Sequence, residues 1–167
     1  MPALSVSCLL LFLLSGCGYQ LGPTNGMAAG SRTVQINLFR NQTFEPRLPE
    51  PLATSLRRWI QRDGTYRLAT QNDADVIVDG TITEYNRVGV SFQPTDVLTV
   101  RDYDIFLVTK FTATERATGR VLASATVTGR TTVRVSADQS SAERQAAPLL
   151  AEDVARRITA MLVDGSW

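Results

Sequence analysis

Apolar and polar residues alternate along four stretches of the chain, with the two-residue period of β-strands that bury one face. These stretches are residues 33–38, 76–85, 98–113 and 120–135. The first places Val34, Ile36 and Leu38 on one side, and the last places Val121 and Val127 on its apolar side. The last two stretches are long and meet at the turn Thr118-Gly119, which predicts an antiparallel hairpin with one solvated face.

Two other segments show the spacing of amphipathic helices. In the first, Leu52, Leu56, Trp59 and Ile60 form one apolar stripe, and Gly64 follows where a helix is expected to end. In the second, an apolar stripe runs from Ala147 to Leu162, but Pro148 lacks the backbone N–H that a continuous helix needs. Either this last helix bends at Pro148, or its main part begins there.

The predicted element order is therefore β-α-β-β-β-α. It indicates an α+β fold, a two-layer sandwich with two helices on one face of a four-stranded, mostly antiparallel sheet. The other face of the sheet is expected to stay polar and open. The segment 88–98, which contains the apolar Phe92, is predicted to be a long connection between two strands. Such connections often bind partners, and a mobile hairpin tip is the alternative.

The N-terminus begins with an apolar run, Leu9 to Leu14, that is too short to span a bilayer. The residues Leu14-Ser15-Gly16-Cys17 follow and resemble the lipobox of bacterial lipoproteins. This resemblance implies a signal peptide over residues 1–16 and a lipid on Cys17, which would become the first mature residue. Gly18, in place of Asp, favours the outer membrane. Residues 17–32 are then a lipidated, flexible tether, and residues 33–167 form a single domain.

Composition excludes several functions. The net charge is +1, from 17 basic and 16 acidic residues, which gives no argument for nucleic-acid binding. The chain has no histidine, and its two cysteines are Cys8 and Cys17, so the mature domain is expected to hold no disulfide, metal or other cofactor. The pairs Asp73/Asp75 and Asp102/Asp104 are interpreted as solvated charges, because no nucleophile motif or phosphate loop accompanies them. An enzyme is not expected.

Cations on the polar sheet face are the candidate binding residues. Alternation places Arg120, Arg130 and Arg134 opposite the apolar face of the last strand, and Lys110 on the polar face of its neighbour. Arginine binds phosphate through two parallel hydrogen bonds, so this face suits a phosphorylated ligand. The alternative is ordinary solubilising charge, since the predicted Lys110 face also carries Asp102 and Asp104.

Four short groups of residues follow one another along the chain. They are Cys17-Gly18-Tyr19-Gln20-Leu21, then Asn41, Thr43, Glu45 and Pro46, then Asp73-Ala74-Asp75 before Val76 to Gly80, and finally Ala142-Glu143, Leu150 and Asp153-Val154-Ala155. Together these motifs resemble the LptE family of lipopolysaccharide-assembly lipoproteins. The resemblance implies a plug inside a large, LptD-like outer-membrane β-barrel, anchored on the periplasmic side, that aids barrel assembly and binds lipopolysaccharide. The alternative is another outer-membrane lipoprotein, either a small-ligand carrier or an assembly pilot for a different pore.

Overall fold

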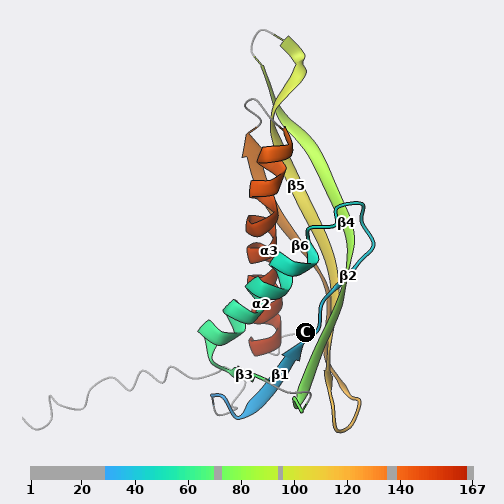
Figure 1. Ribbon diagram of the computed structural model, residues 1–167, viewed down its shortest axis with the longest axis vertical. Coiled ribbons are helices and arrows are strands. Elements are labelled where there is room, and N and C mark those ends of the chain that lie inside the picture. Colours follow the sequence, from blue (N-terminus) through green and yellow to red (C-terminus); the bar gives the residue numbers. More distant parts are fainter. Residues whose placement is uncertain (1–28, 70–72, 94–95, 135–138, 165–167) are drawn as a thin grey trace, which may run out of the picture.

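The computed structural model describes residues 29–69, 73–93, 96–134 and 139–164 (Figure 1). The predicted signal peptide, Cys17 and most of the predicted tether lie outside these ranges. The described elements are β1 (Arg32–Ile36), β2 (Arg40–Asn41), α2 (Pro49–Asp63), β3 (Tyr66–Leu68), β4 (Val76–Gln93), β5 (Asp96–Glu115), β6 (Val121–Arg134) and α3 (Gln139–Asp164). Neither of these helices is long and apolar enough to cross a membrane.

The strands form one mixed sheet, in the order β3-β1-β4-β5-β6, with β2 also paired to β4. β1 pairs in parallel with β3 and β4, whereas β4, β5 and β6 are antiparallel. The α+β class and the two helices are confirmed, but the four-stranded, mostly antiparallel sheet and its element order were wrong. The missed strands, β2 and β3, have two and three residues, too few to show a period in the sequence.

The predicted connection 88–98 is also wrong. Val88 to Gln93 continue β4, and β5 already begins at Asp96, so residues 94–95 alone are left between them, outside the described ranges. Figure 1 shows this hairpin extending past the helices at the top of the molecule. Gly89 and Pro94 suggest a loop locally, but pairing with β5 keeps the backbone extended through several bulges between Gly89 and Gln93.

Helices α2 and α3 cover one face of the sheet, and the core lies between the two layers (Figure 1). Leu52, Leu56 and Ile60 are buried as the helical stripe predicted. Val121 and Leu38, predicted on the apolar side of their strands, are instead 56% and 58% exposed. A register shift between Val121 and Ala123, opposite Thr114 and Ala113, reverses the alternation at the start of β6. β1 ends at Ile36, before Leu38.

Helix α3 continues through Pro148, so a helix that begins at Pro148 is excluded. Its position over the sheet depends on Gly129 of β6, where a Cβ atom would lie only 2.6 Å from Val154 Cγ2 and 3.1 Å from the Leu150 carbonyl oxygen. Asp153 strengthens this contact, because its Oδ2 accepts the Arg130 backbone N–H at 3.2 Å. The helix layer therefore packs tightly on β6 and leaves the opposite sheet face, called the outer face below, open to solvent.

Candidate functional site

The predicted cations do not form one cluster: Lys110, Arg130 and Arg134 are spread along the outer face, and Arg120 lies outside the strands. Across the β5–β6 ladder, Lys110 lies opposite Thr126, Arg130 opposite Phe106, and Arg134 opposite Asp102. Arg120 lies in the turn before β6 and is exposed. The alternation thus places Lys110, Arg130 and Arg134 correctly, but the strand pairing separates Arg120 from the other two arginines.

Each of the three arginines pairs with a carboxylate of this chain. Arg134 Nε lies 2.9 Å from Asp102 Oδ1, and Arg120 Nε lies 3.6 Å from Glu115 Oε2. Arg130 pairs with Asp104 and also lies over the ring of Phe106, 5.8 Å from its centroid. A ligand phosphate would have to compete with these carboxylates.

The outer face carries a ladder of carboxylates and arginines, which consists of Asp102, Asp104, Arg130 and Arg134. The Thr132 hydroxyl donates to Asp104 Oδ1 at 2.6 Å, and this bond and the Arg130 guanidinium lower the pKa of Asp104 although burial opposes them. The hydroxyl of Ser91 and the guanidinium of Arg134 likewise lower the pKa of Asp102. Asp104 is 5% exposed, so its interpretation as a solvated charge was wrong. Acid–base pairs need pKa values pushed apart, whereas both of these are lowered.

Lys110 lies in a shallow depression of about 690 Å³ on the outer face. Its polar lining consists of Arg40, Asp79, Thr81, Lys110, Thr112, Ser124 and Thr126, and the apolar Leu38 also lines it. Arg40 of β2 was missed, because a two-residue strand gives no periodic signal. Within the described ranges, no carboxylate pairs with Lys110 or Arg40, so these cations differ from the three arginines above.

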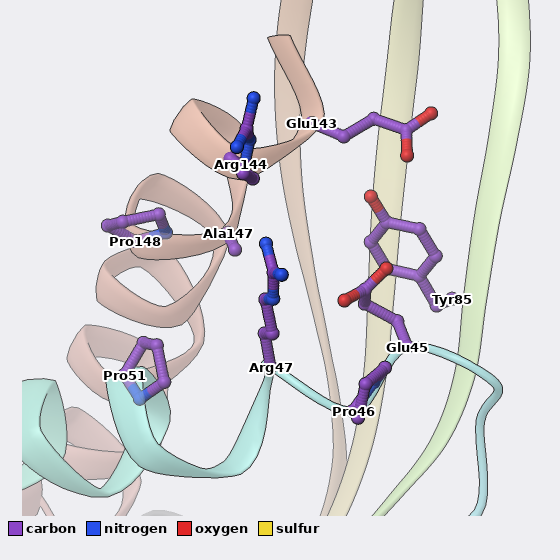
Figure 2. A pocket seen from close by; sticks show the side chains of 9 residues that line it. All are labelled: Glu45, Pro46, Arg47, Pro51, Tyr85, Glu143, Arg144, Ala147 and Pro148. Atoms are coloured by element: carbon purple, nitrogen blue, oxygen red, sulfur yellow. The ribbon is translucent and has the colours of Figure 1, made fainter. Parts of the chain in front are cut away.

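A second hollow, of about 570 Å³, lies on the helix side of the sheet, between the segment before α2, strand β4 and the start of α3. Figure 2 shows Tyr85 on one side of it, below Glu143 and beside Glu45, with Arg47 and Arg144 on the other. Burial, and then the charges of Glu143 and Glu45, raise the pKa of Tyr85, so its hydroxyl stays a hydrogen-bond donor at neutral pH. No sequence pattern indicated this hollow.

Metal ligands do not gather anywhere in the described residues: no group of three or more His, Cys, Asp or Glu side chains could hold an ion there. The predicted lipidation site, Cys17, lies outside those residues.

Comparison with known proteins gives one family. A family model described as LptE, lipopolysaccharide-assembly, matches residues 31–162. No curated protein sequence matches the chain significantly.

Solved structures of the same fold share little sequence with this chain. A crystal structure of a Xanthomonas campestris protein has a TM-score of 0.63 at 12% identity and covers 86% of this chain and 90% of that one. A minor lipoprotein from Acinetobacter baumannii has a TM-score of 0.53 at 16% identity, covering 79% and 92%. The solution structure of an uncharacterized lipoprotein from Nitrosomonas europaea has a TM-score of 0.50 at 13% identity, covering 89% of each chain. At these identities the likeness is one of fold alone.

Proposed function

The chain belongs to the LptE family of lipopolysaccharide-assembly proteins, and on this premise we propose that it is the lipid-anchored partner of an outer-membrane β-barrel in lipopolysaccharide transport. The observation that carries the proposal is the family match, which spans nearly all of the described domain. The fold shared with the Acinetobacter and Nitrosomonas lipoproteins supports the lipoprotein part of it.

The anchor in this proposal is Cys17, on the periplasmic side of the outer membrane. The support is the sequence Leu14-Ser15-Gly16-Cys17 with Gly18 behind it. A single acyl chain binds a membrane only marginally, whereas two or more anchor a protein stably. Intact-mass measurement of the membrane-extracted protein should show a lipid-sized addition on Cys17, and Cys17→Ser should move the protein to the soluble fraction. An unmodified mature protein would exclude the anchor.

The domain is proposed to act by stoichiometric binding to the barrel, as a plug and assembly partner. Depletion of the protein should therefore lower the amount of correctly assembled barrel and the lipopolysaccharide at the cell surface. Re-expression of the wild-type chain should restore both. Normal barrel assembly and normal surface lipopolysaccharide after depletion would favour a small-ligand carrier or a pilot for another pore instead.

Lipopolysaccharide is proposed to contact the outer face through its anionic groups. Lys110 and Arg40 are the first candidates, because no carboxylate among the described residues pairs with them, and several hydroxyl groups surround them. Arg120, Arg130 and Arg134 are 60–66% exposed in their side chains and could add to the attraction, but each is already engaged by a carboxylate.

The binding test compares two double variants of the mature protein. Arg40→Ala/Lys110→Ala should weaken lipopolysaccharide binding by about two- to tenfold, since exposed charge contacts contribute about 0–1 kcal/mol each. Arg130→Ala/Arg134→Ala is the matched pair on the same face and should weaken binding less. Added salt should weaken the wild type most. Equal binding by all three folded proteins would show that these cations only solubilise the face.

A further inference from the structure

β2 is short, and the neighbouring strand β4 continues beyond the end of β2. β2 pairs with β4 at Thr81 and Ile82, and the Gln42 N–H still donates to the Ile82 carbonyl oxygen at 3.0 Å. The chain then leaves the sheet toward α2. In the described part of the molecule, no strand lies beside β4 on this side beyond Ile82. The upper part of β4 is therefore an open edge, visible in Figure 1 above the label of β2.

Backbone groups of known residues face this edge. Val108 turns its carbonyl oxygen toward β4, because that oxygen accepts the Thr83 hydroxyl at 3.2 Å. Val108 lies opposite Glu84, so the backbone N–H and C=O groups of Glu84 point toward β5. Alternation then turns the N–H and C=O groups of Tyr85, Arg87 and Gly89 toward the open edge. The register is regular from Glu84 to Gly89 and shifts on either side, so this free stretch has about the length of an ordinary strand.

The segment that follows β2 is fixed in its own conformation by local hydrogen bonds, just after the Gln42 N–H contacts the Ile82 carbonyl oxygen. Asn41 Oδ1 accepts the Thr43 N–H at 3.0 Å and the Thr43 hydroxyl at 2.8 Å, and Asn41 Nδ2 donates to the Glu45 carbonyl oxygen at 2.7 Å. The Thr43 hydroxyl in turn accepts the Glu45 N–H at 3.2 Å. These bonds present Phe44 fully exposed to solvent. A large aromatic side chain held outward by a hydrogen-bonded loop is typical of an interface anchor.

A groove of about 430 Å³ lies between this segment and the open edge. Its lining is Gln42, Thr43, Phe44 and Glu45 on one side, Thr83, Glu84, Tyr85, Asn86 and Arg87 on the other, and Glu143 of α3. Glu45, Tyr85 and Glu143 also line the neighbouring hollow of Figure 2, so the two spaces share a wall. The open edge thus faces a groove that has an exposed aromatic side chain in its lining.

We propose that this edge groove binds an extended peptide segment of the barrel partner. The segment adds to the sheet as a strand beside Glu84–Gly89, in line with β2. The inference rests on the proposed function for the identity of the partner. The occupant is a peptide strand, because a row of unpaired N–H and C=O groups is satisfied by another backbone and not by an acyl chain or by phosphate. Phe44 packs against the side chains of the added segment.

The test uses position 87, whose N–H faces the open edge. Arg87→Pro removes this donor without removing any bond to β5, whereas Arg87→Ala removes the same side chain, and its pairing with Glu143, but keeps the donor. Full-length tagged protein is purified from outer membranes with its co-expressed barrel. Arg87→Pro should retain about tenfold less barrel than Arg87→Ala, from one lost backbone hydrogen bond and the crowding of the ring.

Amide hydrogen exchange on the wild-type protein keeps the proposal testable if Arg87→Pro fails to fold. The amides of Arg87 and Gly89 should exchange fast in the free protein and slowly in the complex with the barrel. The amides of Asn86 and Val88, which face β5, should be slow in both and serve as the internal control.

The outcomes separate the two proposals. If the wild type retains the barrel, but both variants retain it equally and Arg87 and Gly89 stay unprotected, the edge inference is wrong and the proposed function stands. If the wild type retains no barrel, the proposed function is wrong, and the inference falls with it. Sedimentation tests for a dimer that forms without any barrel. If these amides are protected in such a dimer, the occupant is a second copy of this chain and the assignment is overturned.

Discussion

Gly129 shows, at the scale of one residue, how closely the two layers approach. Gly129→Ala would place a Cβ atom 2.6 Å from Val154 Cγ2 and 3.1 Å from the Leu150 carbonyl oxygen. Because the obstacle includes helix backbone, α3 would have to move, and the free energy of unfolding should fall by about 1–3 kcal/mol. Urea unfolding measures it, with Ser124→Ala on the exposed face of β6 as the control. Unchanged stability would mean that α3 can shift at no cost.

Asp104 should make stability depend on pH. Its pKa is lowered from 3.8 in the folded state by the Thr132 hydroxyl and by Arg130. Its stabilisation is therefore complete above about pH 3.8, where the unfolded carboxyl is ionised, and is lost as pH falls through the lower folded pKa. Asp104→Asn should thus be less stable than the wild type at pH 7, by a margin that shrinks below pH 3.8. The exposed Asp73→Asn is the control, and a constant margin at all pH values would contradict the assignment.

Helix α3 is the element whose sequence and structure conflict most. Pro148 lies inside it, where proline removes one backbone hydrogen bond and crowds the preceding turn. Burial of Ala146, Leu150 and Ala151 on both sides of the proline holds the helix together nonetheless. Pro148→Ala should therefore raise the free energy of unfolding, by up to about 3 kcal/mol. Pro46→Ala, outside any helix, is the control, and no gain at position 148 would show that the helix has already relaxed around the ring.

At the scale of the whole molecule, β6 is also an edge strand, which pairs only with β5 among the described strands. Asp153 of α3 covers part of this edge, since it accepts the Arg130 backbone N–H and also pairs with Arg156 and Arg157. Open edges promote association between chains. Asp153→Ala should free the Arg130 donor and increase self-association in sedimentation velocity, whereas Glu152→Ala, exposed on the same helix, should not. A purely monomeric Asp153→Ala protein would show that helix packing alone protects β6.

At this scale the two edges differ in what lies beside them. α3 lies over β6 and its Asp153 bonds to the edge, whereas a groove with Phe44 in its lining lies beside the upper part of β4. An edge that a helix residue covers resists the addition of another strand, whereas an uncovered edge beside a groove can accept one. The proposed partner site is therefore on the β4 side of the sheet.

Local patterns in the sequence determined the two helices, the four strands β1, β4, β5 and β6, and the faces of Lys110, Arg130 and Arg134. These features depend on periods of two or 3.6 residues, which neighbouring residues alone specify. The family resemblance likewise rested on local motifs, and the family match confirms it. The motif residues Asn41, Thr43 and Glu45 were visible in the sequence, but their role in supporting Phe44 was not.

The tertiary structure alone decided which strands pair and where cations meet carboxylates. β2 and β3 are too short to carry a period, and each is defined only by its pairing with a strand elsewhere in the chain: β3 runs parallel to β1, and β2 runs parallel to β4. Val121 lost its predicted face through a register shift against β5, a contact that its own neighbours do not specify. The pairing of Arg130 with Asp104 joins residues 26 positions apart, and the open edge of β4 follows from where β2 stops. The register between two strands and the open edges of a sheet depend on which strands pair, so no single stretch of sequence specifies them.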